Sequence, residues 1–120
     1  MSIYSELILD NYENPRNVGV VKKPSKRVSV SNPLCGDAIS MSVRIKKGRV
    51  AEIKFEGTGC AISQASSSML TEYVKGKEIV LLKNLDKKFI IMMLGVELGV
   101  NRLKCALLPL EALKKLLVEY

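Results

Sequence analysis

The chain has 120 residues, of which 48% are hydrophobic and 26% charged, and its formal net charge is +7. This composition is that of a folded globular protein and excludes a disordered or low-complexity chain. The length fits a single domain, residues 1–120, that buries a core without disulfide bonds. The absence of histidine excludes Ser-His and Cys-His catalytic pairs and histidine-ligated zinc.

The positive charge does not predict a nucleic-acid partner, because the basic residues occur in short clusters and aromatic residues make up only 5% of the chain. The longest apolar stretch, residues 89–96, is far shorter than the roughly 20 residues of a membrane-spanning helix. Residues 1–14 contain neither the basic nor the apolar region of a signal peptide. We therefore expect a cytoplasmic protein with no membrane partner, in which the three cysteines stay reduced.

In chain order, the first half predicts one helix followed by three strands. Residues 3–13 have apolar side chains at helical spacing, with Ser2 as N-cap and Asn14-Pro15 as the stop. Alternating apolar residues predict strands over 27–31, 39–45 and from 50 to the glycines at 57 and 59. Residues 46–49 predict a hairpin turn, so the strands are expected to form an antiparallel meander.

The second half predicts only helices. The first spans 61–74 with Gly76 as its C-cap, and shorter helices follow at about 78–83 and 86–95, the latter with Asp86 as N-cap. An amphipathic helix is expected from Ala106 or Leu108 to Leu117. Strands followed by helices indicate the α+β class, with helices packed on a small three-stranded antiparallel sheet.

The cysteines are predicted at the boundaries of these elements. Cys35 falls between the first two strands, Cys60 between the third strand and its helix, and Cys105 just before the last helix. A single cysteine is often only a small buried hydrophobic residue. Three at boundaries suggest a site instead, and a helix N-terminus favours the thiolate of Cys60. Gly57 and Gly59 would let the backbone approach whatever that sulfur binds.

Asp37 adds a carboxylate two residues after Cys35, although aspartate in a turn often only bonds its own backbone. Three thiolates and one carboxylate form a four-ligand set that suits tetrahedral zinc or an iron–sulfur cluster. Such a site is net negative, and Lys104 is the candidate cation to offset it, the alternative being a solvated lysine. No CxxC pair occurs, so the ligands suit a partly open site built by the tertiary fold.

Several short motifs occur in order from residue 4 to the last predicted helix. They are Tyr4-Ser5-Glu6, Tyr12-Glu13-Asn14-Pro15-Arg16-Asn17-Val18-Gly19, Asn32-Pro33-Leu34-Cys35-Gly36-Asp37, Gly59-Cys60-Ala61-Ile62-Ser63, Ala65-Ser66-Ser67-Ser68, Val74-Lys75-Gly76-Lys77 and Lys104-Cys105-Ala106. In sequence and in order, these motifs resemble the IscU/NifU/SufU family of iron–sulfur cluster assembly scaffolds.

The resemblance implies a SufE/NifU-like fold and a scaffold rather than an enzyme. It implies that a transient two-iron two-sulfide cluster is assembled on Cys35, Asp37, Cys60 and Cys105. It also implies a cysteine desulfurase that delivers sulfur, a supply of iron, and apo-proteins that receive the cluster. Tyr4 matches the family's N-terminal tyrosine, and we expect it at the contact of a homodimer that forms when the cluster is bound.

Two features depart from the family pattern. Lys104 occupies the position of the histidine in IscU-type members, as in SufU-type members, which bind zinc and accept sulfur, but the long SufU insertion is absent. The alternative function is therefore a zinc-dependent sulfurtransferase, with Lys104 as a charged partner of the ligands and not a ligand itself. Residues 98–102 align with the family's chaperone-recognition motif but lack both prolines, which argues against a dedicated Hsp70-type handover.

Overall fold

The computed structural model describes residues 3–33 and 36–120. The predicted N-cap Ser2 and the predicted ligand Cys35 lie outside the described residues.

The three predicted strands form one antiparallel sheet with the order β1-β2-β3, as the alternating pattern indicates. The strands are β1 (Lys26–Asn32), β2 (Asp37–Lys46) and β3 (Arg49–Thr58). The predicted hairpin turn between β2 and β3 is confirmed. Lys47 and Gly48 form it with φ angles of 54° and 73°, the left-handed pair that a tight two-residue hairpin turn requires.

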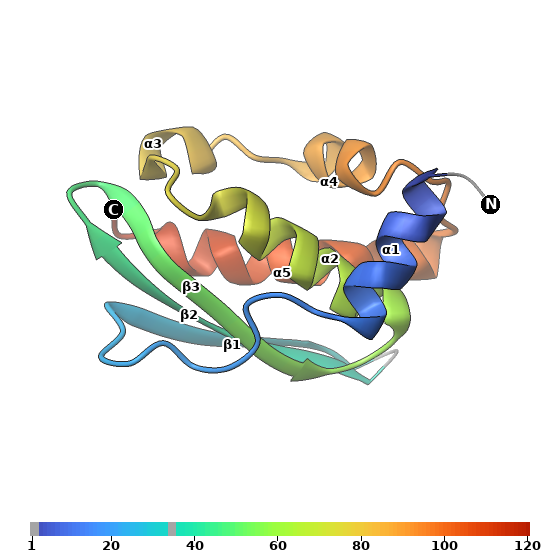
Figure 1. Ribbon diagram of the computed structural model, residues 1–120, viewed down its shortest axis with the longest axis horizontal. Helices are drawn as coiled ribbons and strands as arrows, with labels where there is room; N and C mark the ends of the chain where they lie inside the picture. Colours follow the sequence, from blue (N-terminus) through green and yellow to red (C-terminus); the bar gives the residue numbers. More distant parts are fainter. Residues whose placement is uncertain (1–2, 34–35) are drawn as a thin grey trace.

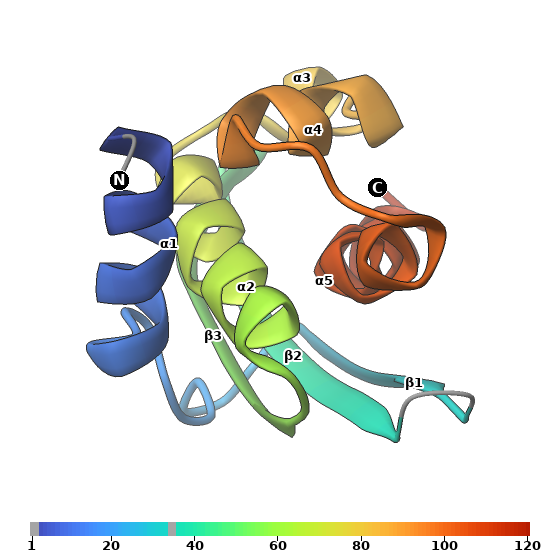
Figure 2. The same ribbon diagram turned by 90° about the vertical axis from the view of Figure 1, so that its right-hand side faces the viewer.

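The helices cover one face of this sheet and flank one another (Figure 1). They are α1 (Ile3–Glu13), α2 (Ala61–Val74), α3 (Ile79–Leu82), α4 (Lys87–Leu94) and α5 (Val100–Leu117). α2 packs on β3, and α5 packs on β1 and β2, while α1 lies beside α2 (Figure 2). α4 contacts α2 and α5 and forms an upper layer with α3. The α+β prediction is confirmed.

The hydrophobic core lies between the sheet and the two central helices. β2 contributes alternate residues such as Ile39 and Met41, and β3 contributes Phe55, all about 1% exposed. Across the core from the sheet, the two helices contribute leucines, including Leu70 of α2 and Leu113 of α5. The period-2 pattern of the strands and the helical period of α5 therefore point to the same interior.

The segment between α1 and β1 closes the edge of β3. The backbone N–H of Phe55 donates to the carbonyl of Asn17 at 2.9 Å, and the N–H of Gly19 donates to the carbonyl of Phe55 at 2.9 Å. Farther along, the N–H of Val21 donates to the Ser42 hydroxyl at 2.9 Å. The two Phe55 bonds use backbone groups of β3 that would otherwise be open to another strand.

The last helix starts earlier than predicted, at Val100 and not at Ala106 or Leu108. Proline is common in the first turn of a helix, but Pro109 lies inside α5. Its missing N–H removes the bond to the carbonyl of Cys105, and the Ser66 hydroxyl of α2 donates to the next carbonyl, that of Ala106, at 2.7 Å. Cys105 therefore lies within a helix, and the prediction that it precedes one is wrong.

The other helix boundaries agree more closely with the sequence. The predicted N-cap of α4 is confirmed, because the Asp86 carboxylate accepts the N–H of Phe89 at 3.1 Å. Gly95 ends α4 in the left-handed region with φ of 66°. At the end of α2 the C-cap is Lys75, and Gly76, predicted for that role, comes one residue later with φ of 78°.

The buried face of α1 differs from its apolar stripe. Ile3, Leu7 and Tyr12 are exposed, Ile8 is half-buried, and the most buried residue is Asn11. The reason is that α1 packs on the Ser68 hydroxyl of α2, which the Asn11 amide satisfies as an acceptor and an aliphatic side chain would not. Across residues 3–33 and 36–120, no helix combines the length and apolar character that crossing a bilayer requires.

Candidate metal centre

Three of the predicted ligands come together from three different elements. Asp37 is the first residue of β2, Cys60 is the N-cap of α2, and Cys105 lies in the second turn of α5. A carboxylate oxygen of Asp37 and the two Sγ atoms all lie within 4.8 Å of one another. Figure 2 looks onto the end of the molecule where α2 begins. Cys35, the fourth predicted ligand, is outside the described residues.

This group of three ligand residues is largely buried, because Asp37 is 2% exposed and Cys105 is 4% exposed. Cys60 is half-buried and forms the more open side. The backbone N–H of Cys60 donates to Asp37 Oδ1 at 3.0 Å, and its Sγ lies 3.7 Å from Oδ2. The strand therefore presents its carboxylate at the start of α2, whose own first turn contains no acidic residue. The positive end of the helix dipole favours an anion at this place.

The Cys60 side chain makes no capping hydrogen bond to α2. Serine, threonine, asparagine and aspartate at this position usually use a side-chain oxygen to cap the helix. The Cys60 sulfur does not cap the helix, so it is available to bind a metal.

Two glycines make the close approach of these elements possible. A Cβ on Gly59 would lie 2.6 Å from Oδ1 of Asp37, and one on Gly57 would lie 2.3 Å from the carbonyl oxygen of Ala38. The room that these glycines leave is thus taken by the start of β2, including the Asp37 carboxylate itself. The requirement is steric, because neither residue has a positive φ angle.

The donor set fits a metal ion. Ligand atoms around a tetrahedral zinc, at about 2.0–2.3 Å from the metal, are roughly 3.3–3.8 Å apart. Separations of up to 4.8 Å therefore need side-chain shifts of only about 1 Å. Thiolates select zinc or the iron of iron–sulfur clusters, and a carboxylate is the harder, oxygen ligand of the set.

Lys104 and Tyr4 are the other two residues that the sequence singled out. Lys104 is exposed on α5, next to Cys105 in sequence, and lines a surface pocket together with Asn32 and Pro33. It forms no hydrogen bond or ion pair with the part of the chain that the structure describes. The ring of Tyr4, which is 46% exposed, lies against Gly95 at the end of α4.

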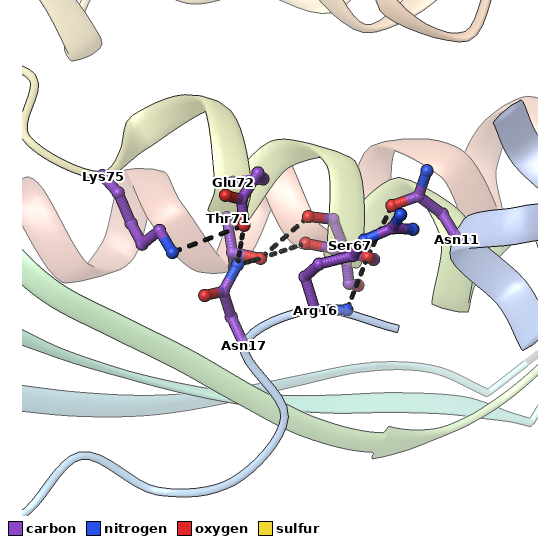
Figure 3. A network of polar contacts seen from close by, with 8 residues as sticks. Asn11, Arg16, Asn17, Ser67, Thr71, Glu72 and Lys75 are labelled. Atoms are coloured by element: carbon purple, nitrogen blue, oxygen red, sulfur yellow. Dashed lines mark hydrogen bonds and ion pairs between the residues drawn. The ribbon is translucent and has the colours of Figure 1, made fainter. Parts of the chain in front are cut away.

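A polar network that sequence reasoning missed supports the centre (Figure 3). The Ser68 hydroxyl donates to Asn11 Oδ1 at 2.7 Å and accepts the backbone N–H of Arg16 at 2.9 Å. The Asn17 amide donates to Thr71 Oγ1 at 3.1 Å and to the Glu72 carboxylate at 3.0 Å. These bonds fix the segment after α1 against α2, the helix that carries Cys60 at its start.

The same network stabilises the negative charge of the Glu72 carboxylate. The hydrogen bond from Asn17 holds the pKa of Glu72 below its usual value of 4.5, with a smaller contribution from the nearby Lys75 ammonium. The signal in the sequence was composition, since α2 has four serines and a threonine among its buried residues. Buried hydroxyls at this density need partners, and the Asn-Pro-Arg-Asn motif supplies donors to two of them, from the Arg16 N–H to Ser68 and from the Asn17 amide to Thr71.

The α+β fold and the convergent thiol and carboxylate groups define a class, a small α+β domain with a candidate thiol-containing metal site. The chain matches the NifU-like N terminal domain family over residues 3–120 and belongs to that family.

Relatives and solved structures agree with this assignment. The chain is 40% identical to the zinc-dependent sulfurtransferase SufU of Bacillus subtilis, covering 95% of this chain and 88% of that protein. It is 36% identical to the iron-sulfur cluster assembly scaffold protein IscU 1 of Archaeoglobus fulgidus, covering 98% and 76%. In fold it resembles a NifU-like N-terminal protein of Brucella abortus, with a TM-score of 0.78, 22% identity and coverage of 98% and 93%.

The match to the Bacillus subtilis protein also bears on the expected absence of the SufU insertion from this chain. It extends over 131 positions while including 95% of this 120-residue chain. The relative therefore has extra residues within the matched region, which agrees with the expectation that this chain lacks the SufU insertion.

Proposed function

We propose that this protein is a scaffold on which a two-iron two-sulfide cluster is assembled and from which it passes to apo-proteins. The observation that carries the proposal is the meeting of Asp37, Cys60 and Cys105 within 4.8 Å, on elements that the fold holds together. In this proposal Cys35 completes the ligand set and the cluster is cargo, not a resident cofactor. The protein thus acts as a carrier and not as an enzyme.

The unequal ligands suit a cargo that has to leave. Thiolates bind iron and sulfide clusters tightly, whereas a carboxylate is a harder ligand and exchanges more readily. Asp37 is held by the N–H of Cys60 through Oδ1, so exchange at Oδ2 does not require α2 to move. Cys60, the more exposed cysteine of the described pair, is the side from which cargo enters and leaves.

The proposal includes partners. A cysteine desulfurase supplies sulfur and apo-proteins receive the cluster; the relative named as an IscU scaffold supports this part. Two cluster-loaded protomers form a homodimer with Tyr4 at or near the contact, which its 46% exposure permits. A dedicated Hsp70-type handover is not part of the proposal, because residues 98–102 lack both motif prolines. The protein works in the cytoplasm.

The second candidate function is zinc-dependent sulfur transfer, which the 40% identity to SufU favours. Zinc would occupy the same ligand set. A cysteine thiolate of this chain would attack the outer sulfur of a persulfide on the desulfurase. The new S–S bond forms as the old one breaks, and the desulfurase cysteine leaves as a thiolate. Lys104, next to Cys105, would supply a positive charge near the arriving anion.

One experiment separates the two functions. Protein purified without oxygen and given iron, cysteine and a desulfurase is examined by ultraviolet–visible absorption and metal analysis. Sulfide-to-iron absorption that is lost when Cys60 or Cys105 is replaced by serine supports the scaffold. A colourless protein with stoichiometric zinc and a protein-bound persulfide supports the transferase. Stoichiometric metal in both serine variants would show that the three residues do not form a metal site.

The dimer is tested separately by light scattering on cluster-loaded protein. We expect Tyr4→Ala to weaken the dimer and Tyr120→Ala, which alters a similarly exposed tyrosine at 42%, to leave it intact. A monomeric loaded protein would refute this part of the proposal and leave the ligand set unaffected.

A further inference from the structure

Ser63, in the first turn of α2, has a buried hydroxyl with no hydrogen-bond partner. Ser63 is 0% exposed, and its Oγ is the one buried side-chain nitrogen or oxygen atom without a partner among the residues that the structure describes. The neighbouring hydroxyls of Ser66, Ser67 and Ser68 all donate hydrogen bonds. A buried hydroxyl without a partner destabilises a fold, so this one calls for a physical reason.

The position of Ser63 points to the metal centre. Residues three apart lie on one side of a helix, so Ser63 lies between Cys60 and Ser66 on α2. Both of those neighbours reach the same part of α5. The Sγ of Cys60 lies within 4.8 Å of that of Cys105, and the Ser66 hydroxyl donates to the carbonyl of Ala106 at 2.7 Å. The intervening side of α2 therefore faces residues 105–106.

We propose that Ser63 is a positioning residue whose hydroxyl donates a hydrogen bond to a metal-bound thiolate of the Cys60–Cys105 pair. This inference rests on the proposed metal centre and adds a donor outside its ligand set. A thiol is a weak hydrogen-bond acceptor, whereas the thiolate that binds a metal is anionic and accepts strongly. In the metal-free protein no acceptor in residues 3–33 or 36–120 lies in hydrogen-bonding geometry to this hydroxyl. We expect it to acquire one when the sulfurs shift by about 1 Å to bind the metal as thiolates.

Removing the Ser63 hydroxyl should therefore change the stability of the metal-free and the metal-loaded protein in opposite directions. Removing the hydroxyl relieves a penalty in the metal-free protein and removes a hydrogen bond from the loaded one. A buried serine with no role at the centre would show only the first effect, because removing its unpartnered hydroxyl would leave metal affinity unchanged. The loss of metal affinity is therefore the result that distinguishes the two roles. Partners that hydrogen-bond metal ligands typically change metal affinity by about 10- to 100-fold when they are removed.

The test compares Ser63→Ala with Ser67→Ala, which removes an equally buried hydroxyl that donates to the Ser63 carbonyl within α2. Zinc affinity is measured by competition with a chromophoric chelator, and the melting temperature is measured on metal-free protein. For Ser63→Ala we expect zinc affinity to fall about 10-fold or more while the metal-free melting temperature rises by a few degrees. For Ser67→Ala we expect zinc affinity to stay within about twofold and the melting temperature not to rise.

A third variant, Ser63→Thr, retains the hydroxyl and should keep most of the affinity that Ser63→Ala loses. Unchanged zinc affinity in Ser63→Ala, or a lower melting temperature of its metal-free form, would overturn the role of Ser63 while leaving the centre intact. A wild-type protein that binds no zinc and no iron would overturn the metal centre itself and this inference with it.

Discussion

Gly59→Ala is the substitution that tests the geometry of the centre most directly without removing a ligand. A Cβ at this position would lie 2.6 Å from Oδ1 and 2.8 Å from Cγ of Asp37. Ordinary contacts between carbon atoms lie at about 3.5–4.0 Å, so the carboxylate has to move by roughly 1 Å. That movement breaks the 3.0 Å hydrogen bond from the N–H of Cys60 and displaces an oxygen of the proposed ligand set.

The expected magnitude follows from opposing effects. A hydrogen bond to a charged group contributes about 1.5–3 kcal/mol, and the restricted unfolded chain of an alanine variant returns about 0.4–1 kcal/mol. We therefore expect the free energy of unfolding of the metal-free protein to fall by about 1–2 kcal/mol. Zinc affinity should fall by about 10-fold or more, since the displaced carboxylate no longer reaches the ion with the thiolates.

The assay is urea denaturation of metal-free protein together with chelator competition for zinc. Gly99→Ala is the matched control, because Gly99 has φ of −64° and no neighbouring atom within 4 Å of its added Cβ. We expect this control to bind zinc like the wild type. A Gly59→Ala protein with wild-type stability and zinc affinity would refute the placement of Asp37 against Gly59 and Cys60.

Three further predictions concern the surroundings of the centre. Asn17→Ala should lower the free energy of unfolding at pH 7 by about 1–2 kcal/mol. Because Asn17 lowers the pKa of Glu72, the part of this stability due to the carboxylate is present above the unfolded-state pKa and is lost as pH falls through the folded-state pKa. Urea titrations should therefore show the difference between variant and wild type narrowing as pH falls below the usual value of 4.5. Gly95→Ala should destabilise the fold by about 2 kcal/mol or more, because of its φ of 66° and the overlap of the added Cβ with the Tyr4 ring, and thermal melting of the double variant with Tyr4→Ala should show part of this loss recovered. Lys104→Arg should largely preserve cluster assembly, measured by absorption, whereas Lys104→Met should weaken it; equal loss in both variants would favour direct ligation by Lys104, and no loss in either would make it a solvated surface residue.

The sheet was predictable because its signals are local. Alternation along the strands and the Lys-Gly pair of the β2–β3 turn depend on residues next to one another in the chain. The caps of α4 were equally local, as Asp86 and Gly95 act within their own helix. These features could be predicted because each residue's preference agrees with the fold around it.

The predictions from sequence are wrong where a residue distant in the chain determines the local structure. The leucine stripe predicted a last helix from Ala106 or Leu108, but α5 begins at Val100, and the Ser66 hydroxyl of α2 hydrogen-bonds to its Ala106 carbonyl. The apolar side chains of α1 suggested a buried stripe, but the Ser68 hydroxyl of α2 selects Asn11 for the interface. Neither partner lies near these residues in the sequence, so periodicity alone does not reveal them.

The candidate site falls between these cases. Its residue types were predictable, because thiols and a carboxylate beside glycines and turns suggest metal chemistry wherever they converge. Their geometry was not, since Asp37, Cys60 and Cys105 come from a strand and two helices. The sequence alone also did not show that the space beside Gly59 is occupied by Asp37 and not by whatever the Cys60 sulfur binds.

The contact between α2 and α5 explains how such a dispersed site holds its shape without a disulfide. α2 carries Cys60 at its start, and Ser66, two turns along, is bonded to α5 beside Cys105. On its other side, α2 is held by the bonds of Ser68 to Asn11 and Arg16. Each such bond contributes only about 1 kcal/mol, but together they limit rotation and sliding of α2, the movements that would separate the two sulfurs. Small hydroxyl residues allow the close helix contacts that larger side chains would prevent, so the serine-rich stretch after Cys60 serves the geometry of the centre.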